Sequence, residues 1–135
     1  MEEVLKSFFG KKVFVTGHTG FKGTWLVFLL RELGAEVMGY SLSTKHEDDH
    51  FNLLNLRGDI THLEGDIRNM TELHDAVNSF QPDYVFHLAA QALVKESYNN
   101  PVATFDTNIM GSVNLLDTVR KTSSIRSLVY ITSDK

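Results

Sequence analysis

The chain carries three glycines at intervals of three residues, Gly17, Gly20 and Gly23. Among its motifs, this spacing indicates a binding site most directly. They follow an apolar run and precede an apolar helical segment, so they occupy a turn from a strand into a helix. In such a turn the first glycine adopts a tight conformation, the second lets the backbone approach a pyrophosphate, and the third lets the helix pack closely. The free N–H groups at the start of the helix favour an anion. The spacing predicts the phosphate-binding turn of a dinucleotide site, with an ordinary glycine-rich turn as the alternative.

The spacing Gly-x-x-Gly-x-x-Gly differs from two others that bind phosphates. One is the Gly-x-Gly-x-x-Gly of older dinucleotide-binding enzymes, and the other is the P-loop, which ends in Gly-Lys and then Ser or Thr. Here Lys22 precedes the last glycine and Thr24 follows it. Lys22 is either a positive charge beside the phosphates or a solvated loop lysine. For His18, packing over the loop is favoured over contact with a ligand.

The composition excludes several classes of protein. The 135 residues carry a net charge of -4, which gives no sign of a nucleic-acid partner or an acidic membrane. Without cysteine there are no disulfides or thiolate metal sites, and the six histidines show no metal-ligand spacing, so we expect no metal. The first residues do not resemble a signal peptide, and the longest apolar run, Trp25 to Leu30, is too short to cross a bilayer. We expect the chain to form a single domain and to act in the cytoplasm.

Apolar periodicity predicts an alternation of strands and helices along the chain. Strands are expected at 13–16, 35–40, 60–65, 84–88 and 127–132, and the main helices at 21–33, 70–80 and 101–121. The helix over 21–33 is apolar almost all round, which predicts that it is buried. The helix over 101–121 carries an apolar stripe formed by Val102, Phe105, Ile109, Val113, Leu116 and Val119.

This alternation defines the expected fold class. Crossovers between parallel strands are right-handed, so the chain is predicted to form an α/β fold with helices on both faces of a parallel sheet. We predict a Rossmann-type doubly wound sheet of five strands in the order 3-2-1-4-5. A ligand should lie where the direction of this order reverses, between strands 1 and 4.

Several motifs occur in an order that resembles a known family. They are Thr16-Gly17-His18-Thr19-Gly20-Phe21-Lys22-Gly23, Gly65-Asp66-Ile67-Arg68, His87-Leu88-Ala89-Ala90-Gln91, Thr107-Asn108-Ile109-Met110-Gly111-Ser112 and Thr132-Ser133-Asp134-Lys135. Together they resemble the extended branch of the short-chain dehydrogenase/reductase family, which contains nucleotide-sugar epimerases and dehydratases. The first and last motifs are most similar to the CDP-glucose branch of the 4,6-dehydratases.

The resemblance covers essentially this whole chain and less than half of a family enzyme. No Tyr-x-x-x-Lys pair, which the family enzymes have, occurs in the sequence. We therefore expect residues 1–135 to be a dinucleotide-binding domain truncated before that pair and before the sugar-nucleotide domain. The resemblance also implies a parent enzyme that is a homodimer through the helix at 101–121, whereas the fragment alone is expected to be inactive.

The resemblance implies NAD as the cofactor and assigns residues to it. Besides the glycines, Thr19, Phe21 and Lys22 belong to its site, and Asp66 and Ile67 hold the adenine; the alternative for Asp66 is a cap on the following helix. Ser41 stands where a ribose-binding acid is usual, so the residues alone leave NAD and NADP open.

Small residues after the fourth strand are assigned to the other end of the cofactor. Leu88, Ala89, Ala90 and Gln91 would let the ribose and nicotinamide lie against the backbone, although close helix packing explains the same residues. Asn108 is expected to brace this backbone from inside the long helix. Lys95 and Ser97 are weaker candidates to face the nucleotide-sugar substrate, for which CDP-glucose is favoured.

The last three residues are the candidate catalytic group. In 4,6-dehydratases the cofactor takes hydride from C4, water is eliminated across C5–C6, and the hydride returns to C6. The resemblance assigns Ser133 to a hydrogen bond with the sugar and Asp134 to the acid. Lys135 stands where related dehydratases have a glutamate base, so its role stays open. The alternatives are a 4-epimerase of the same fold, used in nucleotide-sugar metabolism, and a non-catalytic dinucleotide-binding module.

Overall fold

The chain folds around a parallel sheet of five strands, seen in a computed structural model that describes residues 2–44 and 46–132. The strands are β1 (Lys12–Thr16), β2 (Glu36–Ser41), β3 (Thr61–Glu64), β4 (Tyr84–His87) and β5 (Ser127–Tyr130). Their spatial order is β3-β2-β1-β4-β5, and every neighbouring pair is parallel. The predicted fold class and strand order are confirmed. Thr16, the last residue of β1, lies opposite Tyr40 and His87, so the central strands end together.

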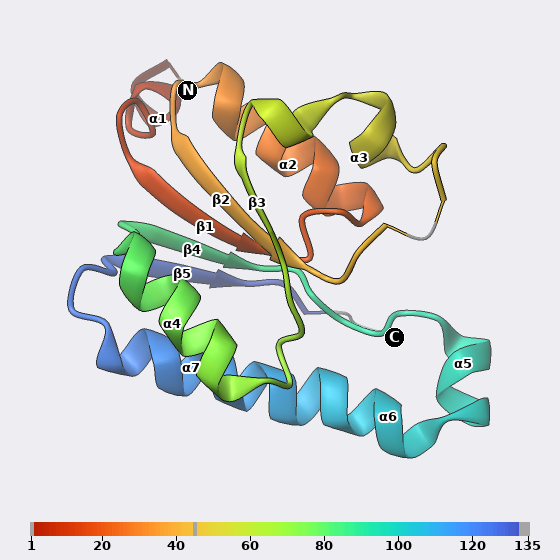
Figure 1. Cartoon of the computed structure of the whole chain (residues 1–135). Helices are drawn as coiled ribbons and strands as arrows, with labels where there is room; N and C mark the ends of the chain where they lie inside the picture. Colours follow the sequence, from red (N-terminus) through yellow and green to blue (C-terminus); the bar gives the residue numbers. More distant parts are fainter. Residues whose placement is uncertain (1, 45, 133–135) are drawn as a thin grey trace.

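Helices cover both faces of the sheet (Figure 1). One face is covered by α2 (Phe21–Glu32) and α3 (His50–Leu53), with the short α1 (Glu2–Lys6) near the amino end; the other is covered by α4 (Met70–Phe80) and α7 (Gly111–Lys121). Successive residues of β1 supply the two cores in turn. Val13 and Val15 pack toward α2, whereas Phe14 packs toward α4. The centre of the sheet, at β1, is therefore buried on both faces, as parallel strands usually are.

The helix that follows the glycine turn is buried on one face only. Gly23, Thr24, Val27 and Leu30 share one side of the helix and are buried against the sheet. Trp25 and Leu29 lie on the opposite side and are about half exposed. The prediction that this helix is buried all round is wrong, because a single helix layer leaves its outer face uncovered whatever residues it carries.

The long helix predicted over 101–121 is divided into three pieces. They are α6 (Pro101–Phe105), the π-helical turn η2 (Asp106–Met110) and α7, preceded by α5 (Val94–Asn99); the remaining short element is η1 (Leu56–Gly58). In the part of the chain that the structure describes, no helix is long and apolar enough to cross a membrane.

The apolar stripe of this segment faces away from the sheet. Of its predicted members only Val119 packs against the core, and the others are exposed. The side facing the sheet carries instead the buried residues Gly111, Ser112, Leu115 and Thr118. Small and hydroxyl-bearing side chains let the helix approach closely, and the hydroxyls of Ser112 and Thr118 are satisfied by carbonyl groups one turn earlier.

Candidate functional site

In the glycine turn, main-chain segments lie so close together that no side chain fits at Gly17 or Gly23. Gly17 has a φ of +73°, and a Cβ built there would lie 2.7 Å from the main-chain nitrogen of Ala89. A Cβ at Gly23 would lie 2.8 Å from the Cα of His18. Gly20 differs, because its Cβ would meet only the Gly17 carbonyl oxygen at 3.4 Å. Gly20 therefore keeps space open in front of α2, where it is the residue preceding the helix.

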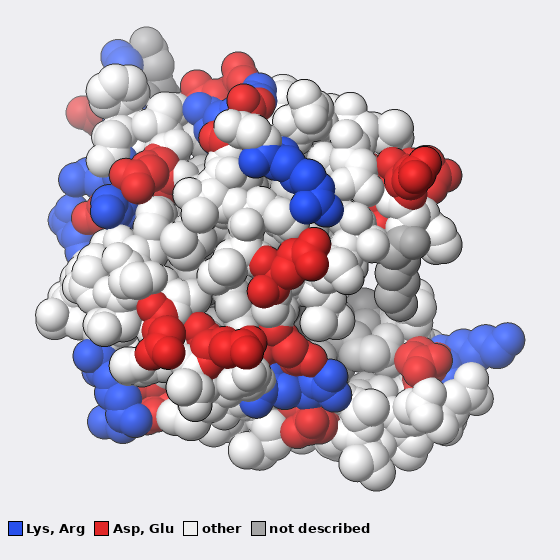
Figure 2. Space-filling model, viewed as in Figure 1, with Lys and Arg blue, Asp and Glu red and all other residues white. Residues whose placement is uncertain are grey.

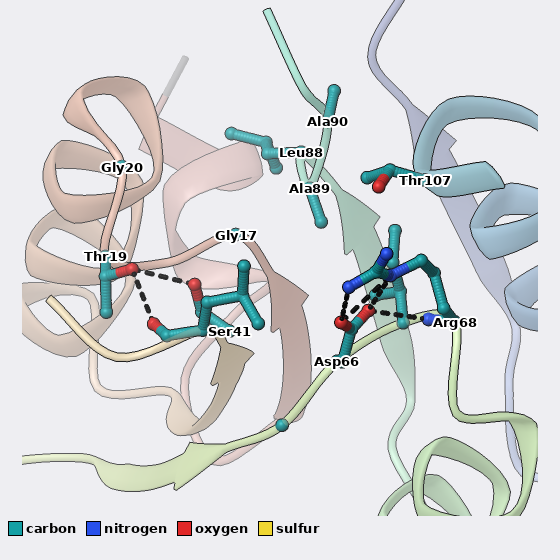
Figure 3. Close-up of a pocket in the computed structure, with 13 residues that line it drawn as sticks. Gly17, Thr19, Gly20, Ser41, Asp66, Arg68, Leu88, Ala89, Ala90 and Thr107 are labelled. Atoms are coloured by element: carbon teal, nitrogen blue, oxygen red, sulfur yellow. Dashed lines mark hydrogen bonds and ion pairs between the residues drawn. The ribbon is translucent and has the colours of Figure 1, made fainter. Parts of the chain in front are cut away.

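A cavity of about 220 Å³ lies in front of this turn, at the carboxyl ends of the strands (Figure 3). It lies where the strand order reverses between β1 and β4, as predicted from the topology. Residues from all the expected segments line it: Gly17, Thr19, Gly20, Ser41, Leu42, Gly65, Asp66, Ile67, Arg68, Leu88, Ala89, Ala90 and Thr107.

Two hydroxyl groups form one side of this cavity. The Oγ1 of Thr19 lies 2.7 Å from the Oγ of Ser41 and 3.3 Å from the carbonyl oxygen of Leu42 (Figure 3). Since the charged groups among the described lining residues are Asp66 and Arg68, this side is polar and uncharged. It can hydrogen-bond a sugar hydroxyl without repelling a phosphate.

Asp66 lies opposite these hydroxyls and is paired with Arg68 (Figure 3). The hydrogen bonds that Arg68 donates hold the pKa of the Asp66 carboxyl below its usual value. Asp66 does not cap α4: the N-cap is Asn69, whose side chain accepts a hydrogen bond from the Glu72 main chain. That alternative is therefore wrong. Ile67 also lines the cavity, and its side chain is buried in the core beside α4 and α7.

A second cavity, of about 610 Å³, adjoins the first along Leu88, Ala89 and Ala90, which line both. Its other lining residues come from the glycine helix, from the segment after β4, from the helices beyond it and from the end of β5: Lys22, His87, Gln91, Ala92, Leu93, Val94, Ser97, Thr104, Asn108, Ser112, Tyr130, Ile131 and Thr132. Lys95, Phe21 and Gly23 line neither cavity. The Phe21 ring is exposed and lies 5.1 Å from that of His50, whereas Gly23 acts through close packing.

Asn108 holds the main chain between the two cavities. Its Oδ1 accepts a hydrogen bond from the Gln91 N–H at 2.7 Å, and its Nδ2 donates to the Gln91 carbonyl at 3.0 Å. A π-helical turn carries Asn108, which is common where a helix serves a functional site.

Replacing Asn108 with alanine is expected to lower the free energy of unfolding by about 2 kcal/mol, because both main-chain groups of Gln91 lose their partner. Urea unfolding measures this. The control is Asn78→Ala at an exposed helix position, where the change should stay within about 0.5 kcal/mol. Equal effects of the two substitutions would contradict the bracing role.

A buried chain of hydrogen bonds supports the same backbone from beneath. The Thr16 hydroxyl oxygen accepts from the N–H groups of Leu88 and Ala89, so its own proton points to the Nδ1 of His87, 2.6 Å away. His87 then carries its proton on Nε2 and donates it to the Oγ of Ser112 at 3.0 Å. Burial lowers the pKa of His87 to about 4, which keeps the ring neutral.

His18 packs beneath the turn, as favoured from the sequence. It is fully buried, its ring lies edge-on to Phe51, and its Nε2 lies 2.6 Å from the Nδ1 of His62. Burial, and next the neighbouring His62, lower the pKa of His18 to about 3. His18 therefore supports the turn as a neutral ring and does not line either cavity.

Sequence reasoning did not assign Arg68 and Thr107 to the site, although both belong to quoted motifs. The sequence could have indicated them by their position, because Arg68 follows Ile67 and Thr107 precedes Asn108, both of which were assigned. The candidate catalytic residues Ser133, Asp134 and Lys135 lie outside the described residues.

The parallel sheet, the glycine turn and the cavities at the strand ends define a Rossmann-type α/β domain. The chain belongs to the GDP-mannose 4,6 dehydratase family, whose model matches residues 14–134.

Comparison with individual proteins shows which enzymes of known name the chain resembles. The chain is 48% identical over 126 residues to a CDP-glucose 4,6-dehydratase of Salmonella typhimurium, a match that covers 93% of this chain and 35% of that enzyme. It is 32% identical to a CDP-paratose 2-epimerase of Salmonella typhi over 92% of this chain and 37% of the other. The UDP-glucose 4-epimerase of Thermus thermophilus, solved in complex with NAD, superimposes with a TM-score of 0.73 at 32% identity over 84% of this chain and 35% of that one. The chain thus spans about a third of the length of its curated relatives.

Proposed function

We propose that this chain is the NAD-binding part of a nucleotide-sugar 4,6-dehydratase that acts on CDP-glucose. The observation that carries the proposal is the floor formed by Gly17, Gly20 and the Leu88–Ala90 backbone, which leaves room for a phosphate-bearing ligand to lie against main chain. The 48% identity to a CDP-glucose 4,6-dehydratase favours this branch over the epimerases.

The described residues fit such a cofactor from end to end. The diphosphate would lie at the start of α2, over Gly20, where free N–H groups and the helix dipole favour negative charge. The adenine would lie at Asp66 and the main chain of Ile67, and its ribose at Ser41 and Thr19. The nicotinamide end would enter the second cavity beside Ala90 and Gln91.

Bound NAD would supply the acceptor and donor of a hydride that leaves the sugar at C4 and returns at C6. Between these transfers the C5 proton and the C6 hydroxyl leave together as one water. Asp134 is proposed to protonate the departing hydroxyl, and Ser133 to hydrogen-bond the sugar. Lys135, adjacent in sequence, is the proposed acceptor of the C5 proton, a role that requires a lowered pKa.

The cofactor site can be tested by calorimetric titration of the 135-residue chain with NAD. We expect saturable binding that ADP-ribose competes for. Gly20→Val should fold, since little surrounds its Cβ, yet should weaken NAD binding more than about tenfold by filling the phosphate position. Gly58→Val, where a Cβ meets nothing within 4 Å, is the matched control. Unchanged affinity in Gly20→Val would contradict the placement of the diphosphate.

The activity can be tested in a chimera in which this chain replaces the matching third of the Salmonella typhimurium enzyme. Incubated with NAD and CDP-glucose, the chimera is expected to convert the sugar to a product that has lost one water, seen by mass spectrometry. A product of unchanged mass would favour the epimerase alternative. Parallel incubations with dTDP-glucose and GDP-mannose test whether CDP-glucose is preferred.

The exposed stripe on α6, η2 and α7 is proposed to pack against a second copy, as the family resemblance implies. Its members include Val102, Phe105 and Ile109, which are 81%, 63% and 51% exposed. Such contiguous apolar surface is typical of an interaction face. We further propose a cytoplasmic place of action in the synthesis of deoxysugars for polysaccharides.

A further inference from the structure

We propose that the hydroxyls of Thr19 and Ser41 make the ribose end of the first cavity accept a 2′-phosphate as well as a 2′-hydroxyl, so that the chain binds NADP as well as NAD. This inference rests on the proposed function, because it concerns the ribose that the proposed cofactor places there. It goes beyond that function by adding a second class of ligand, the 2′-phosphorylated dinucleotide, and by assigning its acceptance to Ser41.

The two hydroxyls can present either a hydrogen-bond acceptor or a donor to the cavity that they line. The Oγ1 of Thr19 lies 2.7 Å from the Oγ of Ser41, and either oxygen can be the donor (Figure 3). When Ser41 donates, Thr19 donates in turn to the Leu42 carbonyl oxygen at 3.3 Å, and the Ser41 oxygen keeps its lone pairs for a ligand. When Thr19 donates to Ser41 instead, the Ser41 proton is free for a ligand. The contact with the Leu42 carbonyl is exposed, so water can replace Thr19 there.

These two arrangements match the two kinds of ribose. A 2′-hydroxyl donates its proton to an acceptor, which is the role of the carboxylate that is usual in NAD sites. A 2′-phosphate presents acceptor oxygens and therefore needs a donor. An ionised carboxylate only accepts hydrogen bonds and repels the phosphate, whereas a hydroxyl can rotate to serve either ligand. With Ser41 at this position, the group that would select against a 2′-phosphate is replaced by one that can bind it.

The acidic residues around this end are already paired with cations. Asp66 is the carboxylate among the described residues that line the cavity, and the Nη2 of Arg68 lies 2.6 Å from its Oδ2. Glu64 lies opposite Ser41 in the register of β2 and β3 but does not line the cavity, and its Oε1 lies 3.8 Å from the Nη1 of Arg57. Neither carboxylate therefore opposes a phosphate with its full charge. Because Arg68 is itself engaged by Asp66, we expect the 2′-phosphate to be tolerated rather than preferred.

Calorimetric titration of the 135-residue chain with NAD and with NADP tests the inference. We expect the wild-type chain to bind the two dinucleotides with affinities within about tenfold of each other. Ser41→Asp should keep NAD binding and raise the preference for NAD above about a hundredfold, because the new carboxylate accepts from the 2′-hydroxyl and repels the 2′-phosphate. Ser41→Asn, similar in size to the aspartate variant but uncharged, is the matched control and should keep the two affinities within about tenfold.

Ser41 is buried and Thr19 is partly exposed, so Thr19→Asp and Thr19→Asn repeat the comparison at a position that tolerates a new charge more readily. In this pair too, the aspartate variant should reject NADP and the asparagine variant should not.

The ratio of the two affinities separates failure of this inference from failure of the proposed function. A wild-type chain that binds NAD but binds NADP more than about tenfold more weakly would overturn the inference and leave the proposed cofactor site intact. An unchanged ratio in both folded aspartate variants would also overturn it, because neither hydroxyl would then face the 2′-position. A wild-type chain that bound neither dinucleotide would instead contradict the proposed function.

Discussion

Replacing Gly23 with alanine is expected to lower the free energy of unfolding by about 3 kcal/mol, the upper end of the cost of overpacking. The new Cβ would lie 2.8 Å from the Cα of His18 and 2.9 Å from the carbonyl carbon of Gly17, and closer still to its oxygen. These are main-chain atoms, so no rotamer change can make room. The helix would have to move away from β1 and widen the phosphate turn. In an exposed helix the same change would be stabilising, by about 1 kcal/mol.

Urea unfolding measures this loss, with Gly58→Ala as control. Nothing lies within 4 Å of a Cβ at Gly58, so its free energy of unfolding should stay within about 0.5 kcal/mol of wild type. A Gly23→Ala chain as stable as the control would show that the close approach of α2 to the turn is not required.

Acidification from pH 7 to pH 5 is expected to lower the free energy of unfolding by about 4 kcal/mol, about 2 from each of two buried histidines. The pKa of His18 is lowered from 6.5 to about 3, and that of His87 to about 4, both chiefly by burial. Below pH 6.5 the unfolded chain therefore binds protons that the folded chain does not, so stability falls as the pH falls. His62 is hydrogen-bonded to His18, so the change in free energy assigned to His18 includes the contribution of His62.

The measurement is urea unfolding at pH 7, 6 and 5. Substituting His87 with asparagine should remove about half of the pH dependence, whatever its effect at pH 7. Replacing Asn78, an exposed residue without a titratable side chain, with alanine is the control and should leave the pH dependence unchanged. A free energy of unfolding that stays constant between pH 7 and pH 5 would contradict the neutral, buried state of both rings.

The sheet and its order were predictable because the signals were local. The apolar runs around Val15 and Val85, the glycine turn and right-handed crossovers leave few arrangements of five parallel strands. The helix over Met70–Phe80 follows directly from its periodicity, because its apolar residues Leu73, Ala76, Val77 and Phe80 share one face and are buried.

The other features of the fold and the site could not be predicted, because they depend on contacts between segments that are distant in the sequence. The stripe from Val102 to Leu116 has the period of a buried face, yet the sheet packs against Ser112 and Leu115 instead. Periodicity reports that a face is apolar and not what covers it. Likewise the neighbourhood of Arg68, Asp106 and Asp66 exists only once the loop after β3 meets η2.

The site depends on the number of residues in the π-helical turn η2, because this turn joins α6 to α7 and sets how one is rotated relative to the other. An α-helix advances about 100° per residue, so removing one residue from such a turn restores a regular helix and rotates everything before it by that angle. Asn108 lies within the turn and Ser112 just after it, and they support the same backbone from two sides. In homologous chains this segment should therefore tolerate substitutions far better than a one-residue insertion or deletion, and an alignment gap between Asp106 and Gly111 would mark a site built differently.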